Sequence, residues 1–372
     1  MARRSAALTA SVVLLLVLAA PVAADGHHDN GHHGPTRYVV TNLVSDGSVP
    51  GTRVDPNLVN GWGIVAGPAT PWWVADNGLD ASTLYDGTGA PRPLVVSVPG
   101  GPTGTVFNGT SSFVVTDGST SGPAKFLFAN EAGMILGWNP TVPASSTQAQ
   151  VGADRSSVGA VYKGLAIGTV GTASYLYATD FHNGRVDVFD GTFGLRSWAG
   201  AFMDPRLPAG YAPFGISNLG GRLFVTFAKQ DAAGHDEIDG KGLGIVDVFG
   251  TDGSFQGRVA TRHELNAPWG LAMAPMTGFG QFSGDLLVGN FGDGRIHAFR
   301  WEAGEREHGR WEPGHWEGAG VLRGTDRHPI TIDGLWGIGF GNGTASGPTT
   351  SLYFAAGPGG EAHGLFGSIA VQ

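Results

Sequence analysis

A short hairpin pattern that recurs along the chain limits what this sequence can fold into. Residues 176–189 read LYATDFHNGRVDVF, two runs of alternating apolar residues joined by a polar turn that ends in Gly184. This alternation is typical of β-strands, and a glycine in the turn can take the positive φ that a tight hairpin needs. Residues 286–299, LLVGNFGDGRIHAF, repeat the pattern with Gly294 in the turn. A hairpin that recurs with its turn residues indicates an array of one structural unit.

Six such units follow one another, and each begins with a glycine followed by apolar residues. The glycines are spaced 41 to 67 residues apart, which leaves room for four short strands and variable loops in each unit. Regular strands with irregular loops favour a β-propeller over a solenoid, whose repeats are shorter and more uniform. The six opening glycines are Gly63, Gly104, Gly164, Gly215, Gly270 and Gly337.

The two ends of the chain predict how the ring closes. Residues 37–44, RYVVTNLV, form an extra strand without an opening glycine, and the chain ends in the strand LFGSIAV. We expect the N-terminal strand to become the outer strand of the last blade, since this pairing removes open sheet edges. The sequence therefore predicts an all-β fold, a six-bladed β-propeller with its ring closed by the N-terminal strand pairing with the last blade.

The composition agrees with this fold class and excludes several kinds of site. The 372 residues include 63 glycines and 22 prolines, and 14% are charged, which is typical of many short strands joined by tight turns. There is no cysteine, so disulfides, thiolate metal sites and cysteine nucleophiles are excluded. The formal net charge of -9 argues against nucleic acid or an anionic membrane as a partner, because both attract a basic face.

The N-terminal segment has the pattern of a secretory signal. Two arginines precede an apolar run, and the sequence VAA at residues 22–24 supplies a cleavage site of small residues. We expect residues 1–24 to be a signal peptide and the protein to be secreted, with no membrane span because no later apolar run approaches about 20 residues. Residues 25–36 are polar and contain paired histidines, so we expect a disordered tail before a single propeller, residues 37–372.

Residues before the opening glycines and polar corners after the second strands should converge on one face of the ring. In a propeller blade the first strand lines the central channel, and the corner between second and third strands returns to the face where the first strand began. Apolar walls with a few convergent polar groups are the usual setting of a ligand site. We expect a small molecule or glycan to bind at this channel mouth, through Trp62, Asp76, Lys163, Phe214, Lys229, Trp269, Asp293, Trp336 and His363.

The same corners offer oxygen ligands for a metal ion. Asn130, Asp180 and Asn290 come from three different units, and carboxylate and amide oxygens suit Ca²⁺. A bound Ca²⁺ would polarise an ester carbonyl, and His182 would then act as a general base. If His182 and His363 served as ligands instead, zinc or another transition metal would be favoured. The alternative is that Asp and Asn occur at these corners for their local hydrogen bonds in turns.

Two longer loops depart from the repeat. Residues 231–239 in the fourth unit carry four carboxylates and a histidine, flanked by Lys229 and Lys241. Their spacing does not fit an EF-hand, so the loop is either another kind of Ca²⁺ loop or a solvated loop at the rim of the site whose charge the flanking lysines neutralise in part. Residues 301–320 are rich in tryptophan and should lie on the opposite face, either packed on their blade or as a carbohydrate-binding platform.

Several stretches together resemble a known family. DPNLVNGWGI, LYATDFHNGRVDVFD, LNAPWGLA and GDLLVGNFGDGRI, all within residues 55–342, resemble a family of exported bacterial proteins of uncharacterised function. The blade pattern also resembles the NHL repeat, which implies a propeller, usually with six blades. Propellers of that type include calcium-dependent lactonases of the gluconolactonase kind and non-catalytic binding modules. The resemblance implies no ligand set residue by residue.

The sequence is compatible with three functions. The sequence contains no nucleophile elbow, no phosphate-binding glycine loop before a helix and no zinc-protease motif. We therefore expect a protein that binds a small molecule or glycan. The alternatives are a Ca²⁺-dependent hydrolase or lactonase, and a protein-interaction scaffold that uses the opposite face and would lose its partner on deletion of residues 302–318.

Overall fold

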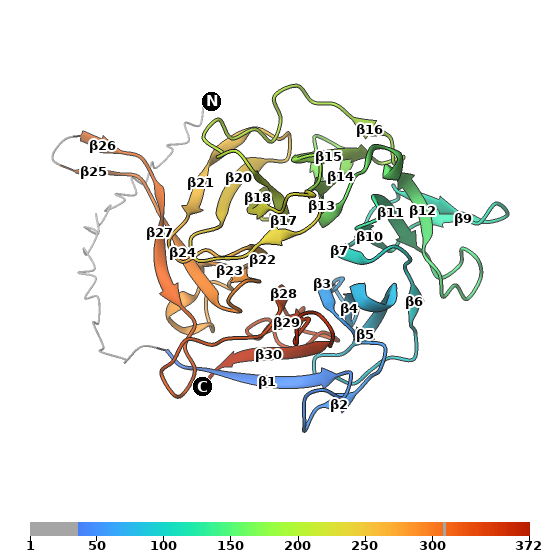
Figure 1. Cartoon of the computed structure of the whole chain (residues 1–372), viewed down its shortest axis with the longest axis horizontal. Coiled ribbons are helices and arrows are strands. Elements are labelled where there is room, and N and C mark those ends of the chain that lie inside the picture. The colour runs from blue at the N-terminus through green and yellow to red at the C-terminus, as the bar shows by residue number, and fades with distance from the viewer. Residues whose placement is uncertain (1–35, 308–309) are drawn as a thin grey trace, which may run out of the picture. The chain divides into compact units, whose positions relative to one another are not determined.

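The computed structural model describes residues 36–307 and 310–372, and these are almost entirely β-structure (Figure 1). Helical segments in these ranges are the 3-10 turns η1 (Asn77–Leu79), η2 (Ser156–Val158) and η3 (Gly280–Phe282). In this described part, no helix has the length and apolar character needed to cross a bilayer. The expected signal peptide, residues 1–24, and the expected tail up to residue 35 lie outside the described residues.

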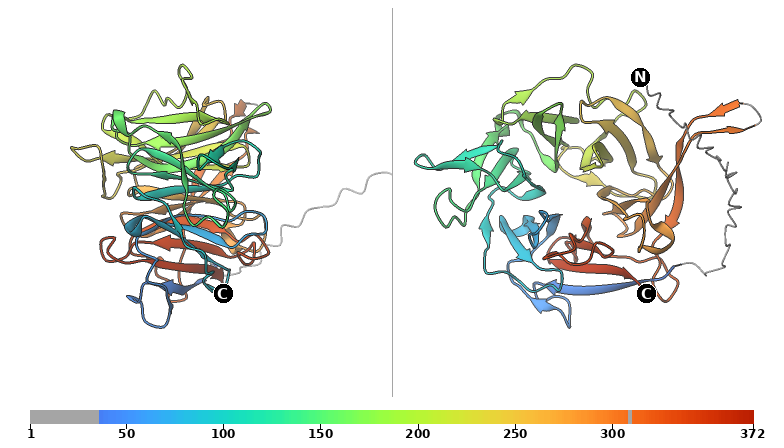
Figure 2. Two further views of the ribbon diagram at one scale, coloured as in Figure 1. Left: turned by 90° about the vertical axis from the view of Figure 1, so that its right-hand side faces the viewer. Right: turned by 180° about the vertical axis from the view of Figure 1, so that it is seen from behind.

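Six antiparallel sheets follow one another around a central axis, and each begins with its innermost strand (Figures 1 and 2). The first blade contains β3 (Gly61–Val65), β4 (Trp72–Asp76), β5 (Ala81–Tyr85) and β6 (Val96–Ser97). The second contains β7 (Pro102–Phe107), β10 (Phe126–Asn130), β11 (Met134–Trp138) and β12 (Gln150–Asp154). The third contains β13 (Tyr162–Val170), β14 (Ala173–Asp180), β15 (Arg185–Asp190) and β16 (Leu195–Arg196). The fourth blade contains β17 (Tyr211–Leu219), β18 (Arg222–Gln230), β20 (Ile245–Gly250) and β21 (Phe255–Thr261). The fifth contains β22 (Pro268–Met273), β23 (Leu286–Asn290), β24 (Ile296–Glu302) and β27 (His315–Val321).

The sixth blade closes the ring by joining the two ends of the propeller. It contains β28 (Leu335–Phe340), β29 (Leu352–Ala356), β30 (Leu365–Val371), β1 (Tyr38–Ser45) and β2 (Arg53–Val54). Strand β1 runs antiparallel to β30, with Tyr38 opposite Val371 and Ser45 opposite Leu365. The predicted six-bladed propeller, closed by its N-terminal strand, is therefore confirmed.

The opening glycines lie where the innermost strands of adjacent blades approach each other closely. A Cβ atom on Gly337 would lie 2.5 Å from the carbonyl oxygen of Trp62, and one on Gly63 would lie 2.5 Å from that of Thr103. At all six glycines the backbone of the next blade comes within 2.8 Å of such an atom. Any side chain at these positions would push two blades apart, so the ring itself requires glycine there.

The hairpins that define the repeat have the predicted turn geometry. Strands β14 and β15 pair with Asp180 opposite Arg185, and Gly184 has φ +66°. Gly294 takes the same φ in the corresponding corner of the fifth blade. These corners return the chain to the face on which the innermost strands begin, which places their polar residues near the channel mouth.

Two small hairpins extend from the blades. The first is β8 (Val114–Thr116) paired with β9 (Ser121–Pro123), and the second is β25 (Glu305–Glu307) paired with β26 (Arg310–Glu312). The second forms the end of an arm that β24 and β27 support (Figure 1). Near the base of this arm, Trp316 packs edge to face against Phe224 of the fourth blade, with ring centroids 5.7 Å apart. The base of the tryptophan-rich segment therefore packs on the propeller.

Candidate functional site

Aromatic side chains from four innermost strands meet on the axis of the ring. Trp62 stacks on Trp336 with centroids 3.5 Å apart and an angle of 17° between the ring planes. Trp269 contacts both rings edge to face at 5.9 Å, and Phe214 contacts Trp336 from the fourth blade. Because the contacts of Trp62 with Trp269 and of Phe214 with Trp336 connect blades that are not adjacent, the rings cross the channel. We call Trp62, Phe214, Trp269 and Trp336, with Phe181 and Phe291 packed beside them, the aromatic plug.

The plug differs from the open aromatic collar that the sequence suggests. Phe214 and Trp336 have no exposed surface, and Trp62 is 2% exposed. These rings therefore fill the channel and offer no free face to a ligand. The sequence places an aromatic residue before four of the glycines, but it does not show that the side chains turn toward one another.

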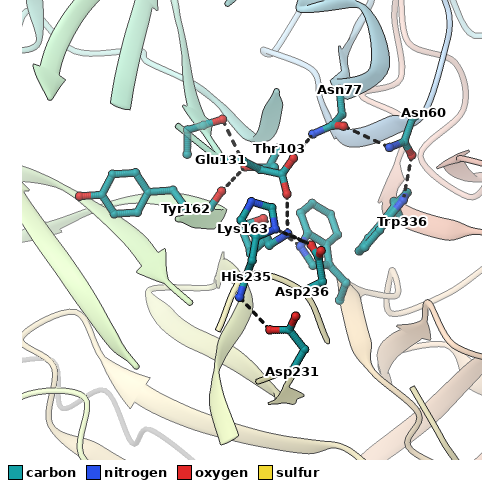
Figure 3. A network of polar contacts seen from close by, with 12 residues as sticks. Asn60, Asn77, Thr103, Glu131, Tyr162, Lys163, Asp231, His235, Asp236 and Trp336 are labelled. Carbon is teal, nitrogen blue, oxygen red and sulfur yellow. Dashed lines mark hydrogen bonds and ion pairs between the residues drawn. The ribbon is translucent and has the colours of Figure 1, made fainter. Parts of the chain in front are cut away.

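The ammonium group of Lys163 lies next to the plug and contacts two carboxylates from other blades (Figure 3). Lys163 directly precedes an opening glycine and is 1% exposed. Its Nζ donates hydrogen bonds to Glu131 and, at 3.0 Å, to Asp236. It also lies 5.2 Å from the centroid of the Trp62 ring, within the range of a cation–π interaction.

A chain of hydrogen bonds extends from this ion pair into the first and sixth blades (Figure 3). Asn77 donates to the second oxygen of Glu131 at 2.8 Å. Asn60 donates to Asn77 at 3.1 Å and accepts a hydrogen bond from the indole of Trp336 at 3.2 Å.

The fifth blade completes this arrangement. The indole N–H of Trp269 donates to the backbone carbonyl of Lys163 at 2.9 Å. All six blades therefore contribute to one polar network. We call it the axial site, consisting of Asn60, Asn77, Glu131, Lys163, His235, Asp236, Glu237 and Glu361.

The axial site contains more carboxylates than its single lysine can neutralise. Burial alone would lower the pKa of Lys163, but the charge and hydrogen bond of Glu131, with the charges of Glu237 and Asp236, raise it. Burial raises the pKa of Glu237 to about 7, although Lys163 acts in the opposite direction. Burial and the charge of Glu131 likewise raise the pKa of Glu361. Lys163 is thus a fixed cation, and Glu237 can gain or lose a proton near neutral pH.

Three of these residues have the chemistry of a metal site. Glu131, His235 and Asp236 each offer a ligand atom, and these atoms lie within 4.8 Å of one another. One imidazole and two carboxylates suit zinc or another transition metal better than Ca²⁺. A metal ion bound there would lie beside the ammonium of Lys163, and repulsion between the two cations would weaken its binding.

The three calcium ligands expected from the sequence are each engaged in their own blade. Asn130 accepts a hydrogen bond from the backbone N–H of Met134 at 2.7 Å. Asp180 accepts hydrogen bonds from the backbone and side chain of Asn183, at 3.2 and 2.8 Å. The amide of Asn290 donates to a backbone carbonyl at 2.8 Å. In the described part of the chain no hydrogen bond joins the three residues. The oxygens of Asn130 and Asp180 stabilise their own corners, whereas the side-chain oxygen of Asn290 is buried without a hydrogen-bond partner among the described residues.

The remaining predicted residues lie at the corners with different surroundings. Asp76 is fully buried, which raises the pKa of its carboxyl, and the side chain and backbone of Thr83 offset only part of this effect. Asp293 accepts a hydrogen bond within its own corner at 3.1 Å. His363 lies 2.8 Å from the carboxylate of Asp46, and His182 is exposed. No hydrogen bond or ion pair joins His182 to His363 among the described residues.

The acidic loop of the fourth blade reaches the axis, which the sequence did not show. Part of it forms β19 (Glu237–Ile238), which pairs with the end of β18 so that Ile238 lies opposite Lys229. The sequence suggested Lys229 and Lys241 as the cations that neutralise part of this loop. In the structure, Asp236 of the loop forms an ion pair with Lys163 from the third blade. The sequence signal for this arrangement was the cluster of acidic residues itself, since clustered carboxylates need a cation.

The chain is similar to two viral proteins and to several solved propellers. No family model matches it. "Uncharacterized protein R648" of Acanthamoeba polyphaga mimivirus is 32% identical over 322 residues, covering 82% of this chain and 75% of the relative. "Uncharacterized protein L690" of the same virus is 32% identical over 320 residues, covering 82% and 80%. The resemblance expected from the sequence was to exported bacterial proteins, whereas these relatives are viral.

Two solved structures share the fold at low sequence identity. A structural genomics protein of unknown function from Bacteroides thetaiotaomicron is 12% identical with a TM-score of 0.53, covering 91% of this chain and 76% of that one. A glucose dehydrogenase is 13% identical with a TM-score of 0.50, covering 88% and 99%. At such identities the likeness concerns the fold alone.

Proposed function

Since this chain belongs to the family of the mimivirus proteins R648 and L690, whose names carry no activity, we propose from its geometry that it is a binding protein for a small molecule or glycan at the axial site. The observation that supports this proposal is the polar network to which all six blades contribute around Lys163. Burying a lysine among several carboxylates costs free energy of folding. Replacing all members of such a buried ionic cluster together by hydrophobic residues often stabilises a protein. A site retained at that cost is best explained by a ligand.

The charges of the site favour a ligand that donates hydrogen bonds. Glu131 and Asp236 share one ammonium, while burial, opposed only in part by Lys163, raises the pKa values of Glu237 and Glu361. Amine or hydroxyl groups on a ligand would supply the missing donors, and an amine would also supply positive charge. Sugars present several such donors on one small molecule, and an amino sugar combines both kinds.

Titration calorimetry with three sugars tests this proposal. We expect glucosamine to bind at neutral pH more tightly than glucose or N-acetylglucosamine, because it alone carries an ammonium group. Glu131→Gln should weaken glucosamine binding at least tenfold, a loss of about 1.4 kcal/mol. Glu305→Gln, an exposed carboxylate on the arm, is the matched control and should leave binding unchanged. Absence of heat with all three sugars, or equal binding by both variants, would contradict the proposal.

Metal-dependent hydrolysis is a second candidate, supported by the ligand atoms of Glu131, His235 and Asp236 within 4.8 Å of one another. A metal there would polarise an ester carbonyl, and His182 at the rim would serve as the general base. Elemental analysis after dialysis against zinc or calcium should then find one ion per chain. His235→Ala should abolish that ion and any ester hydrolysis, whereas His363→Ala should affect neither. A metal-free protein whose melting temperature does not respond to a chelator would exclude this candidate.

A further inference from the structure

A cavity of about 520 Å³ lies in the channel on the side of the opening glycines away from Lys163. The residues that directly follow these glycines all line it, together with residues one or two positions further along the innermost strands. This ring of lining residues consists of Ile64, Thr105, Leu165, Ile216, Leu271 and Ile338. Five of the six are aliphatic, so the repeat builds an apolar wall around the axis.

Two polar side chains in this wall are already engaged in hydrogen bonds. Thr105 donates a hydrogen bond to a backbone carbonyl of its neighbouring strand at 3.2 Å. The side chain of Asn218 donates to the carbonyl of Ile167 at 2.9 Å and accepts from the backbone N–H of Gly221 at 3.0 Å. No residue lining the cavity is charged. The wall is therefore uncharged, and its aliphatic side chains can pack against an uncharged molecule.

The aromatic plug forms the inner end of the cavity. Trp269 is one of the lining residues, and its indole N–H donates to the backbone carbonyl of Lys163 on the other side. The other end is accessible, because Val65, Phe107 and Ser217 are partly exposed. The lining extends about three residues beyond the glycines, which corresponds to a depth of roughly 10 Å. The channel is thus divided into a charged compartment and an apolar compartment.

We propose that this apolar compartment is a second binding site, for an uncharged apolar small molecule. Its volume lies within the range of about 300 to 1,000 Å³ that drug-sized ligands occupy in proteins. The wall supplies dispersion contacts on all sides, and Trp269 of the plug provides an aromatic surface at the inner end. This site is separate from the axial site and does not depend on the function proposed for it.

Binding of N-phenyl-1-naphthylamine, an uncharged apolar dye that fluoresces in apolar surroundings, tests the proposal with the full chain. We expect one dye molecule per chain in the wild-type protein. Ser217→Trp should fill the outer part of the cavity and weaken binding at least tenfold. Ile167→Glu, which places a charge in a partly exposed part of the wall, should have the same effect and serves as the second variant if Ser217→Trp fails to fold.

Two control variants locate the dye. Glu131→Gln alters only the axial site, so it should leave dye binding unchanged. Trp311→Ala removes an indole that is 61% exposed on the arm, and it should also leave binding unchanged. The proposal is overturned if the wild-type protein does not bind the dye, if Ser217→Trp and Ile167→Glu bind it as well as the wild type, or if Trp311→Ala alone abolishes binding.

Discussion

The ammonium of Lys163, which is 1% exposed, donates a hydrogen bond at 3.0 Å to Asp236, whose side chain is 62% exposed. A buried cation is therefore held in part by a carboxylate on an accessible loop. The other carboxylate, Glu131, comes from a different blade and is 20% exposed. Any molecule that reaches the axis from this face meets the loop first and Lys163 behind it.

Replacement of Lys163 by methionine should destabilise the protein strongly, because it leaves Glu131 and its neighbours without their cation. Breaking a buried ion pair by removing one partner costs about 3 to 5 kcal/mol in the free energy of unfolding, measured by urea denaturation. Arg92→Met is the control, since the exposed pair of Arg92 with Asp86 should contribute at most about 1 kcal/mol. An equal loss in the free energy of unfolding for the two variants would show that Lys163 contributes no more to stability than an exposed ion pair does.

Gly337→Ala should destabilise the ring, because the added Cβ would lie 2.5 Å from the carbonyl oxygen of Trp62. Overpacking of this kind costs about 1 to 3 kcal/mol, and here the contact joins the last blade to the first. Gly109→Ala is the control, since its nearest neighbour would be a side-chain atom of Phe107 at 3.4 Å. Thermal unfolding should show a lower melting temperature for Gly337→Ala alone; a melting temperature equal to that of wild type would mean that the blades can separate slightly without loss.

The sequence was sufficient to predict the ring but not the axial site. The six glycines recur with a local pattern, so the blades and their closure could be predicted from periodicity and turn residues alone. Lys163, Glu131 and Asp236 belong to three blades, and no spacing in the sequence relates them. Their meeting depends on how far a loop reaches across the axis, which is a property of the folded ring.

The proposed calcium ligands show a second reason why the site could not be read from the sequence. Asn and Asp are suitable both for turns and for Ca²⁺ coordination, and the same oxygen serves either purpose. Asn130 and Asp180 use theirs to close their own corners. For the aromatic residues, the sequence predicted a position at the axis, whereas the packing of Trp62 on Trp336 follows from the exclusion of water once the ring closes.

Asp76→Asn should increase stability at alkaline pH, because the carboxylate of Asp76 is fully buried and its interaction with Thr83 offsets only part of the cost of burying its charge. Burial raises the pKa of Asp76 well above its usual value, so the folded state holds a proton that the unfolded state releases. Stability should therefore fall as pH rises above about 3.9, the ordinary pKa of Asp, until the folded-state pKa is passed. The amide removes this loss and should raise the melting temperature at pH 8 by about 1 to 2 °C for each kcal/mol recovered.

Asp180→Asn provides the comparison for Asp76. Burial raises the pKa of Asp180 as well, but Asp180 accepts hydrogen bonds from Asn183 and lies 3.5 Å from Arg185. Because the amide loses these contacts, Asp180→Asn should raise the melting temperature at pH 8 less than Asp76→Asn does. A lower melting temperature for Asp76→Asn at pH 8 would contradict the prediction for Asp76.

Glu237→Gln should flatten the dependence of stability on pH between about 4.3 and about 7. The pKa of Glu237 is raised by burial to about 7 in the folded state, whereas an unfolded chain has the ordinary value of about 4.3. The folded state then binds more protons in this window, and stability falls as pH rises through it and stays constant above it. Melting temperatures between pH 4 and pH 8 measure the effect, with Glu305→Gln as an exposed control. An unchanged pH profile for Glu237→Gln would assign the titration to other groups.

A deletion in the arm can test the scaffold hypothesis without destabilising the propeller, if its end points leave the strands of the fifth blade intact. Removing residues 302–318, as the sequence suggested, would delete half of β27 and with it the outer strand of the fifth blade, where Trp301 lies opposite Trp316. A variant that joins Glu302 to His315 through Asn-Gly instead keeps this pairing and removes only the β25–β26 hairpin.

This shortened variant should unfold at the same temperature as the wild type, because the β25–β26 hairpin lies at the end of the arm and its Trp311 is 61% exposed (Figure 1). Trp316→Ala should instead lower the free energy of unfolding by about 2 kcal/mol, since Trp316 packs against Phe224 and Trp301. If the protein is a scaffold that uses the arm, pull-down from its native host should lose the partner with the shortened arm and keep it with Glu131→Gln. Loss of the partner with Glu131→Gln alone would place recognition at the axial site, where the ligand-binding proposal already locates it.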